Sequence, residues 1–362
     1  MRRSPIRGAA GLKVLELSVG LSAASAGLIL RAQGAEVSVA DGFGPRDLDK
    51  YERAYYERGK SLLEVSWQVA LQAADILICD LPLGRCREIG LPLTIEDLPP
   101  GKVAVYLTPF GLTGPHADFA SSDITEWAAG GIAYVSRRDV PESDETGYSP
   151  VLPPGRQPEV LAGIAGATAA LFGRLHAEST GEAVIADVSR QEVQAAMLHG
   201  VVPPFVWNSI VLGSPESRVA TGMLVPASDG LFYLRPVEPH HWTALYKWIG
   251  HPEWTTEAWA SDAGARQQQM PLIRELVGIW TSQFPRLQLL VDGQAHGVPV
   301  ALPRDIDEVL ASEHLSEREF WQRVVVDGRS GLAPAIPMLD PGEWGPNPDR
   351  DRGAAPAEKA IA

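Results

Sequence analysis

The sequence predicts an α/β protein with a doubly wound parallel sheet in its N-terminal part and a smaller α+β unit later in the chain. Three observations predict this class. Short apolar runs alternate with helix-forming segments, glycines mark the junctions between them, and the composition changes after Pro203 and Pro204. The chain has 362 residues, which is more than a single compact core usually serves, so two domains are expected.

The first sixty residues carry the clearest pattern. Residues 13–18 alternate between apolar and polar and are bounded by Gly11 and Gly20, which predicts a strand. Residues 23–33 favour a helix that ends at Gly34, and residues 36–41 form a second strand-like run. A strand, a helix and a strand within this span make a βαβ unit, whose two strands are parallel. Further strands are expected at residues 62–65, 76–79 and 103–107.

A long helix starts near Pro158 and ends at the turn 179–181. Its residues are small or aliphatic on nearly every side, so we expect the whole helix to be buried. It follows an exposed loop at 137–156, rich in Pro, Glu, Ser, Asp and Gly, and it precedes a strand at 183–188 and a helix at 191–199. The small unit shows a strand at 231–234, helical segments at 242–249 and 273–280 and an apolar run at 287–290; the tail after Pro334 is expected to be irregular.

Composition excludes several function classes. The formal net charge is −14, from 31 basic and 45 acidic residues, which argues against binding to nucleic acid. Two cysteines, Cys79 and Cys86, cannot build a disulfide framework or a cysteine zinc site, and the histidines show no metal-ligand spacing. No signal core and no run of about 20 apolar residues is present. We therefore expect a cytoplasmic protein without a bound metal and without a membrane partner.

A dinucleotide cofactor is not favoured by the first βαβ turn. Asp41 ends the second strand, where an acid that binds ribose would lie. The turn at 18–27 lacks the G-x-G-x-x-G pattern, however, and without its second glycine the backbone cannot approach a pyrophosphate closely. A nicotinamide-dependent dehydrogenase is therefore only a third hypothesis.

Glu159 is the strongest candidate for chemistry. It is the one carboxylate in the first turn of the apolar helix, where the helix dipole favours its ionised form while burial opposes it. Such a carboxylate can act as a nucleophile or a general base. The alternative is that an acid is simply favoured at a helix N-terminus.

Two further segments could bind a ligand. The turn at 108–115, which includes Thr108, Phe110 and Gly111, follows a strand directly, where parallel sheets place their ligands. Arg58 and Lys60 flank a glycine and could hold a phosphate. The alternative for residues 108–115 is an ordinary turn without a ligand. The alternative for Arg58 and Lys60 is a basic turn exposed to solvent.

These segments, in order along the chain, resemble the family III CoA transferases, a group that includes formyl-CoA, carnitine and bile-acid CoA transferases and α-methylacyl-CoA racemases. The resemblance extends through most of the chain. Its motifs lie at residues 11–17, 34–37, 57–62, 110–115, 122–123, 130–131, 180–181, 187–189, 227–230, 242 and 296–299.

The resemblance implies an interlocked homodimer. It implies a Rossmann-like large domain at residues 1–205, a small α+β domain at 222–310 and a return to the large domain at 311–362. It also implies that coenzyme A or acyl-CoA is a substrate, with no permanently bound cofactor, and that a carboxylic acid is the second substrate. By the resemblance the CoA-binding residues would be Val19, Gly20, Arg58, Lys60, Asp80, Leu81, Arg87, Thr108, Phe110 and Gly111.

The family's catalytic aspartate lies 21 positions before its Thr-Gly turn, and counting back from Thr180 reaches Glu159. The implied activity is transfer of CoA between an acyl-CoA thioester and a free carboxylic acid, through anhydride and glutamyl-CoA intermediates on Glu159. Backbone N–H groups near the glycines would stabilise the oxyanions. The racemase branch needs a histidine where this chain has Ser122, so transfer is favoured over racemisation.

The sequence departs from the family pattern at several CoA-binding positions. An Asn-Phe pair is replaced by Asp80 and Leu81, a basic residue by Gly42, and an A-G-P run by the residues at 22–24. A carboxylate at position 80 would repel a pyrophosphate unless it points away. The alternative function is therefore a catalytically silent relative that binds acyl-CoA, or a partner subunit of an active homologue.

Overall fold

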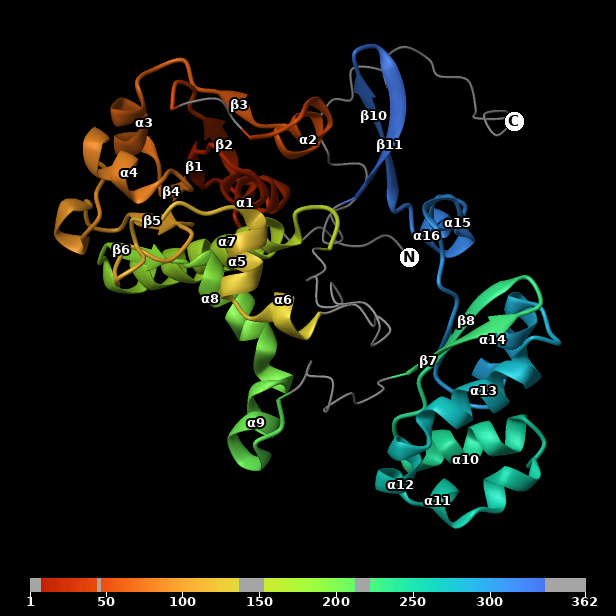
Figure 1. The fold of residues 1–362 in the computed structure, drawn as a ribbon. Helices are drawn as coiled ribbons and strands as arrows, with labels where there is room; N and C mark the ends of the chain where they lie inside the picture. The colour runs from red at the N-terminus through yellow and green to blue at the C-terminus, as the bar shows by residue number, and fades with distance from the viewer. Residues whose placement is uncertain (1–7, 44–46, 137–152, 212–221, 336–362) are drawn as a thin grey trace. The chain divides into compact units, whose positions relative to one another are not determined.

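A computed structural model describes residues 8–43, 47–136, 153–211 and 222–335 (Figure 1). The chain forms two compact units. The large unit comprises Met1–Gly213 and His314–Ala362, and the small unit comprises Ser214–Glu313. Residues 137–152 of the predicted loop, and the predicted tail beyond residue 335, lie outside the described residues.

The large unit is built on a six-stranded, all-parallel sheet, which confirms the predicted α/β class. Its order is β3-β2-β1-β4-β5-β6, so the winding direction reverses between β1 and β4 (Figure 1). In such sheets the crevice at the carboxyl ends of these two strands is the usual ligand position. The strands are β1 Lys13–Leu17, β2 Glu36–Val39, β3 Ser61–Leu62, β4 Ile76–Cys79, β5 Val103–Tyr106 and β6 Val184–Asp187.

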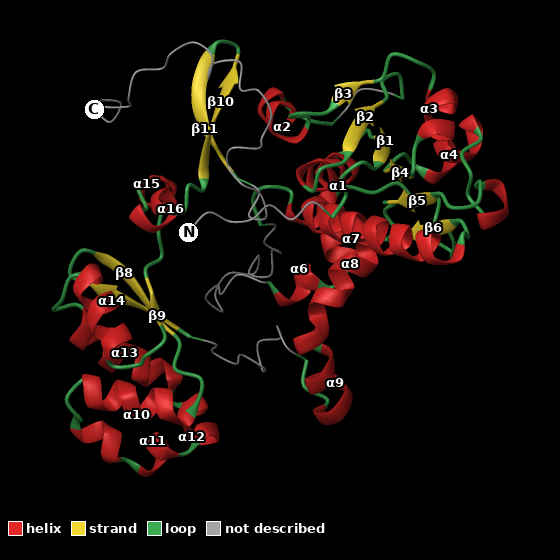
Figure 2. Ribbon diagram, turned by 180° about the vertical axis from the view of Figure 1, so that it is seen from behind, coloured by secondary structure: helices red, strands yellow, loops and turns green. Residues whose placement is uncertain are grey.

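Helices cover both faces of the sheet (Figure 2). Alternate strand residues point to opposite faces, so Val14 packs with α1 and α7, while Leu15 packs with α3 and α4. The helices of the large unit are α1 Leu21–Ala32, α2 Lys50–Tyr56, α3 Trp67–Ala73, α4 Leu83–Ile89, α5 Asp123–Ala129, α6 Ile132–Val135, α7 Gln157–Thr180, α8 Arg190–Ala196, α9 Val202–Asn208 and α16 Glu313–Glu317. An antiparallel hairpin, β10 Trp321–Val326 and β11 Arg329–Pro334, packs on α2.

The strand predicted at 62–65 is shorter than expected. Only Ser61 and Leu62 pair with β2, and Val65 is exposed. The sequence predicted a strand there, but the segment lies at the edge of the sheet, where only one neighbour is available for pairing.

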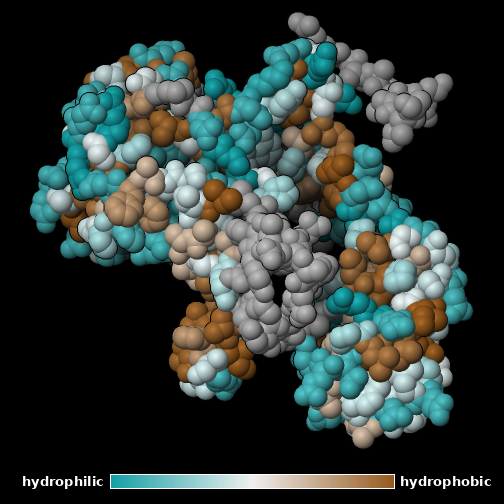
Figure 3. Space-filling view, viewed as in Figure 1, coloured by the Kyte–Doolittle hydropathy of each residue, from teal (hydrophilic) through white to brown (hydrophobic). Residues whose placement is uncertain are grey.

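Helix α9 exposes most of its apolar residues. Trp207 is 76% exposed, and Val202, Phe205 and Val206 are also exposed. Figure 3 shows this helix as a hydrophobic surface of the large unit. Among the described residues of one chain, no other apolar side chains cover this surface, although burial of such residues is strongly favourable.

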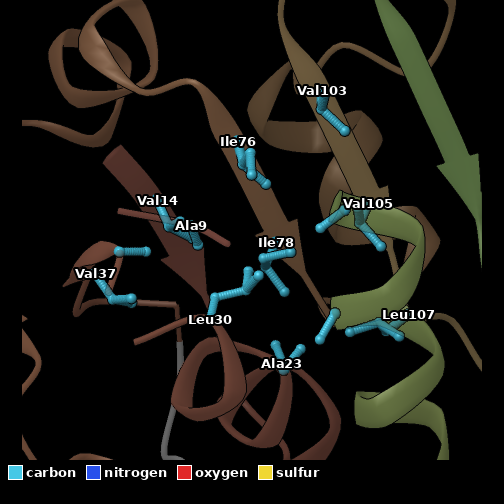
Figure 4. Packing of buried hydrophobic residues seen from close by; sticks show 14 of the residues in the cluster. Ala9, Val14, Ala23, Leu30, Val37, Ile76, Ile78, Val103, Val105 and Leu107 are labelled. Atoms are coloured by element: carbon cyan, nitrogen blue, oxygen red, sulfur yellow. The ribbon is translucent and has the colours of Figure 1, made fainter. Parts of the chain in front are cut away.

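The prediction that α7 is buried all round is wrong. Its buried stripe consists of small residues, and Gly163, Gly166 and Gly173 lie in contact with α1, β5 and β6. Its largest side chains point the other way, with Phe172 69% exposed and Leu175 also exposed. Figure 4 shows the side of the sheet on which α1 and α7 pack, with Ala23, Leu30 and Leu107 among the labelled core residues. The small residues let α7 approach α1 and the sheet closely, so the helix meets the core on one face only.

Helix α7 is also the one described helix that is long and apolar enough, by composition, to span a bilayer. This differs from the expectation that no such run exists. Nine of its residues are buried inside the large unit, where it packs on α1 and on β5, as core helices of α/β units do.

The small unit has a core of its own. Three antiparallel strands, in the order β7-β8-β9, pack against helices through Phe232, Trp242, Leu245 and Ile273. The predicted run 287–290 lies inside a helix. The elements are β7 Met223–Ala227, β8 Gly230–Leu234, β9 Val300–Ala301, α10 Pro239–Trp248, α11 Ala258–Ser261, α12 Ala263–Gln268, α13 Met270–Thr281, α14 Arg286–Ala295 and α15 Ile306–Leu310.

Candidate active site at the start of helix α7

Glu159 lies in the first turn of α7, and 9% of its side chain is exposed. Pro158 suits the first turn of a helix. Arg156 is the residue just before the helix, and its φ of 50° lies outside the right-handed helical region, so the helix can begin only after it. Few non-glycine residues adopt this left-handed conformation, which costs free energy and is concentrated at functional sites.

Three hydrogen bonds reach the Glu159 carboxylate. Arg156 Nη2 donates to Oε1 at 2.8 Å and to Oε2 at 2.7 Å, and the backbone N–H of Leu21 donates to Oε2 at 2.9 Å. Leu21 is the first residue of α1, whose unpaired N–H groups and dipole attract anions. Charge-assisted donors of this kind are the usual partners of a carboxylate anion.

Arg156 also connects Glu159 to the start of α2. Its Nη2 lies 3.0 Å from Asp47 Oδ2 and its Nη1 lies 3.4 Å from Glu52 Oε2, and Nη1 donates to the carbonyl of Asp47. The Asp47 side chain is largely exposed, so solvent screens that contact more than the contact to Glu159.

Asp80 lies at the same helix end, immediately after β4. Its carboxylate is buried and accepts from the N–H groups of Val19 at 2.8 Å, Gly20 at 3.3 Å and Ala23 at 3.0 Å. Burial raises the pKa of Asp80, and these N–H groups oppose that rise. A Cβ added at Gly20 would lie 3.2 Å from Asp80 and 3.9 Å from Glu159, so both carboxylates converge on this glycine.

The N-terminus of α1 is therefore filled by side chains of the chain itself. In dinucleotide-binding folds the pyrophosphate lies at this helix end, at the point where the strand order reverses. Here Asp80 and Glu159 accept its hydrogen bonds. Asp80 thus occupies the N–H groups at which a pyrophosphate would lie in a dinucleotide-binding fold.

A second group of charges lies beside Glu159 and was not singled out from the sequence. Arg190, the first residue of α8, pairs with the buried Glu126 of α5 at 2.7 Å. Burial raises the pKa of Glu126, and Arg190 opposes the rise. Burial also raises the pKa of Asp123, and the charge of Glu159 raises it further. The sequence feature that could have identified Arg190 is its position shortly after β6. The carboxyl ends of parallel strands meet at this edge of the sheet, where ligands usually bind.

The predicted glycine turn lies between β5 and α5. Thr108 is fully buried, and the Phe110 ring contacts the rings of His116 and Phe119 edge to face. Gly111 has φ of 92°, and the backbone N–H of Leu112 donates to both carboxylate oxygens of Asp187. This N–H group, an expected oxyanion donor, already has an anionic partner.

Four other predicted CoA contacts have side chains engaged elsewhere. The Lys60 ammonium is 1% exposed and bonds Glu16 at 2.6 Å, and Leu81 is buried in the core under α4. Arg87 pairs with Asp118 at the surface. Arg58 donates to the carbonyl of Arg323 in the hairpin. A contact of Lys60 or Leu81 with CoA would require the side chain to leave the core, because burial holds both and the ion pair with Glu16 also holds Lys60.

The residues predicted to bind CoA are thus only partly brought together. Val19, Gly20 and Asp80 lie against the same helix end as Glu159. A cavity of about 590 Å³ lies instead between α2 and the β10–β11 hairpin, and Glu159 does not line it. Among the described residues, no three His, Cys, Asp or Glu side chains are placed to hold a metal.

Sequence comparison identifies the group to which this fold and site belong. The profile of CoA-transferase family III matches residues 68–357, which is most of the chain. The chain belongs to CoA-transferase family III. This shows the resemblance drawn from the motifs to be right.

Its relatives in the family are distant. A probable CoA-transferase of Mycobacterium tuberculosis is 29% identical over 254 residues, covering 67% of this chain, which spans 31% of that protein's length. The succinyl-CoA–D-citramalate CoA-transferase of Chloroflexus aurantiacus is 24% identical over 85% of this chain and 81% of its own. The crystal structure of a CAIB/BAIF family protein from Brucella suis has the same fold, with a TM-score of 0.71, 19% identity, and coverage of 94% of this chain and 97% of its own.

Proposed function

We propose that this family III protein transfers CoA between an acyl-CoA thioester and a free carboxylic acid, with Glu159 as the nucleophile. The observation that carries the proposal is the carboxylate of Glu159, held by Arg156 and by the N–H of Leu21 at the carboxyl edge of the sheet. An oriented carboxylate can attack an acyl carbon, and 9% of the Glu159 side chain is exposed.

The reaction proceeds by four substitutions that conserve charge. A Glu159 oxygen attacks the thioester carbon, the C–S bond breaks, and its electron pair leaves on the CoA sulfur. The thiolate then attacks the glutamyl carbon of the resulting anhydride, and the first acid leaves as a carboxylate. The second acid attacks the glutamyl-CoA thioester, and the thiolate finally attacks the new acyl carbon and restores Glu159. Each difficult exchange becomes two easier covalent steps.

Donors at Glu159 would stabilise the oxyanions of these steps. The N–H of Leu21 and the guanidinium of Arg156 already point at the carboxylate, and groups set in place before reaction need no reorganisation. In this proposal Leu21 and Arg156 take the role of oxyanion donors that the sequence analysis gave to N–H groups near the glycines, since the N–H of Leu112 is bound to Asp187.

We propose CoA as a transient substrate, with no resident cofactor. Val19, Gly20, Thr108, Phe110 and Gly111 are the predicted contacts whose backbone or side chains lie at the carboxyl ends of β1 and β5. For the acids, the name of the Chloroflexus relative suggests a first choice. It acts on succinyl-CoA, so succinyl-CoA and succinate are the substrates to test first.

We also propose that the working protein is a homodimer in the cytoplasm. The exposed apolar side chains of α7 and α9 support a second copy as their partner, because their burial would be favourable. Two free, buried cysteines suit a reducing compartment.

Intact-protein mass spectrometry after mixing with acyl-CoA tests the nucleophile. We expect a covalent adduct on Glu159 that hydroxylamine removes, and a loss of CoA exchange of about a thousandfold or more in Glu159→Gln. Glu178→Gln is the matched control, because Glu178 is an exposed glutamate of the same helix that also pairs with an arginine. Exchange in Glu159→Gln at the parental rate would make this assignment wrong. Binding of acyl-CoA with no exchange of label would support the silent relative instead.

A further inference from the structure

The charge at Glu159 changes during the proposed reaction. In the free protein its carboxylate is an anion that accepts from Arg156 at 2.7 and 2.8 Å. Once Glu159 is part of an anhydride or a thioester, it carries no negative charge. Arg156 then loses its strongest partner at the moment when a free carboxylate must leave or arrive beside it.

Arg156 is built into this position. Its side chain is 22% exposed and its backbone has φ of 50°. Besides Glu159, its guanidinium contacts Asp47 through Nη2 and Glu52 through Nη1. A guanidinium can hold a carboxylate through both of its oxygens, and here Nη2 donates to both oxygens of Glu159. The contacts to Asp47 and Glu52 would keep it in place when Glu159 is acylated.

We propose that Arg156 is a catalytic residue that binds the carboxylate of the leaving and the incoming acid, in place of the neutralised Glu159. This inference rests on the proposed function, because it needs an acylated Glu159. In the free protein and in the glutamyl-CoA state, but not in the two anhydride states, one carboxylate faces Arg156. It is Glu159 itself in the free protein and the substrate acid in the glutamyl-CoA state. Specificity for acids over neutral acceptors follows from this exchange of partners.

The other buried cations near α1 and α5 are less suited to this role. Lys60 is paired with Glu16 inside the large unit, and Arg190 is paired with Glu126, whose charge the reaction does not change. Releasing either cation would leave a carboxylate buried without a partner, at high cost. Of these three cations, only Arg156 has a partner that the chemistry neutralises.

A consequence is that the resting protein should bind free acid weakly. Glu159 fills the carboxylate position until it is acylated, so an acid competes with it for Arg156. The acid would then bind well only after CoA has loaded the enzyme, which prevents an unproductive complex of acid and free protein.

Calorimetric titration with sodium succinate tests the site without any catalysis. Glu159→Gln in the full chain keeps the shape of Glu159 but removes its charge, as acylation does. We expect it to bind succinate at least about tenfold more tightly than the parent protein, and we expect the added change Arg156→Ala to remove that gain. Glu178→Gln should bind succinate as the parent does. Equal affinity of Glu159→Gln and the parent would overturn the proposal.

Steady-state kinetics test the same residue during turnover, with the thioester that loads Glu159 as donor and succinate as acceptor. Arg156→Ala should raise the KM for succinate by about 10- to 100-fold and change the KM for the thioester by less than about threefold. Arg156→Lys should restore part of the loss. Arg174→Ala is the control, since Arg174 lies in α7, which Arg156 directly precedes, is similarly exposed and also pairs with a glutamate. Equal changes in both KM values would indicate a purely structural role and overturn the proposal.

The two hypotheses fail in different ways. If no thioester loads Glu159 while Glu159→Gln binds succinate through Arg156, the proposed function is wrong and the carboxylate site stands. If CoA is transferred while Arg156→Ala leaves the KM for succinate unchanged, the role of Arg156 is wrong and the proposed function stands.

Discussion

Single charged residues differ greatly in what they contribute, and burial is the reason. Lys60 and Glu16 form an ion pair whose side chains are 1% and 0% exposed, and Lys60 also donates to the carbonyl of Ala24. Lys50 and Asp327 form a pair of equal length at the surface. Breaking a buried pair leaves a charge without solvent or partner, whereas a surface charge is simply hydrated.

We expect Lys60→Ala to lower the free energy of unfolding by about 3–5 kcal/mol, because Glu16 stays buried without its counterion. Urea denaturation followed by circular dichroism measures the change. Lys50→Ala is the matched control and should leave the unfolding midpoint where it is. Similar midpoints for the two variants would mean that Glu16 finds another partner or water.

Asp80 predicts a pH effect whose sign follows from its burial. Burial raises the pKa of Asp80, so the folded chain retains this proton at pH values where the unfolded chain has lost it. Folding stability due to this residue therefore falls as the pH rises above about 4. Asp80→Asn removes the titration, so its stability relative to the parent should improve as the pH rises above about 4 and level off once the pH passes the pKa of Asp80 in the folded chain.

Urea titrations of both proteins across that range provide the measurement. The exposed Asp307→Asn, in the small unit, should follow the parental pH dependence. A difference between Asp80→Asn and the parent that is constant with pH would show that Asp80 has the same pKa in both states.

At the scale of elements, the contact between α1 and α7 positions Glu159. Gly163 lies where a Cβ would be 2.6 Å from the Cβ of Ser25 and 2.8 Å from the carbonyl of Ser22. Both of these residues belong to α1, and Glu159 lies one turn before Gly163. The spacing of these two helices therefore determines whether Glu159 reaches the N–H of Leu21.

Gly163→Ala should destabilise the protein by about 1–3 kcal/mol through overpacking, and it should lower CoA transfer by displacing Glu159. Thermal unfolding and exchange assays measure the two effects. Gly84→Ala in α4 is the control. Its Cβ would meet nothing within 4 Å, so the same substitution should leave stability unchanged or raise it by up to about 1 kcal/mol. A Gly163→Ala variant as stable as the parent would show that α1 can move aside without cost.

At the scale of the molecule, exposed apolar surface sets the expectation for assembly. Phe205 and Trp207 in α9 and Phe172 in α7 are largely exposed within the chain. We expect sedimentation velocity to give twice the mass of one chain. Trp207→Lys together with Phe205→Lys should shift the protein towards the monomer, because both charges would be buried at the contact. A monomeric parent at micromolar concentration would contradict the homodimer.

The parallel sheet could be predicted because its strands are short apolar runs, the first of them between Gly11 and Gly20, and such runs are a local property of the sequence. Where each strand begins and ends depends on the neighbouring strand with which it pairs. The run from Leu62 to Val65 lies at the edge of the sheet, and most of it is not paired with β2. The burial of α7 was predicted wrongly, because its apolar residues are of two kinds. Small ones face the core, and large ones such as Phe172 face outwards.

The candidate site divides in the same way. Glu159 could be proposed from its place at a helix start and from the motif spacing. Arg156 stands three residues before it, a spacing at which charges pair, but the left-handed turn that aims it could not be derived from local sequence. Asp80 and Arg190 reach the same edge of the sheet from distant strand ends, and only strand pairing shows this.

By itself, then, the sequence determined the doubly wound class, the family and the carboxylate worth testing, because periodicity, glycine positions and motif order are properties of neighbouring residues. Only the tertiary structure decided which groups meet that carboxylate. The N-terminus of α1, Arg156 and Asp80 come together through the winding of the sheet, and the hydrogen bonds that result join residues far apart in the chain. Such contacts depend on packing between elements, which no local pattern encodes.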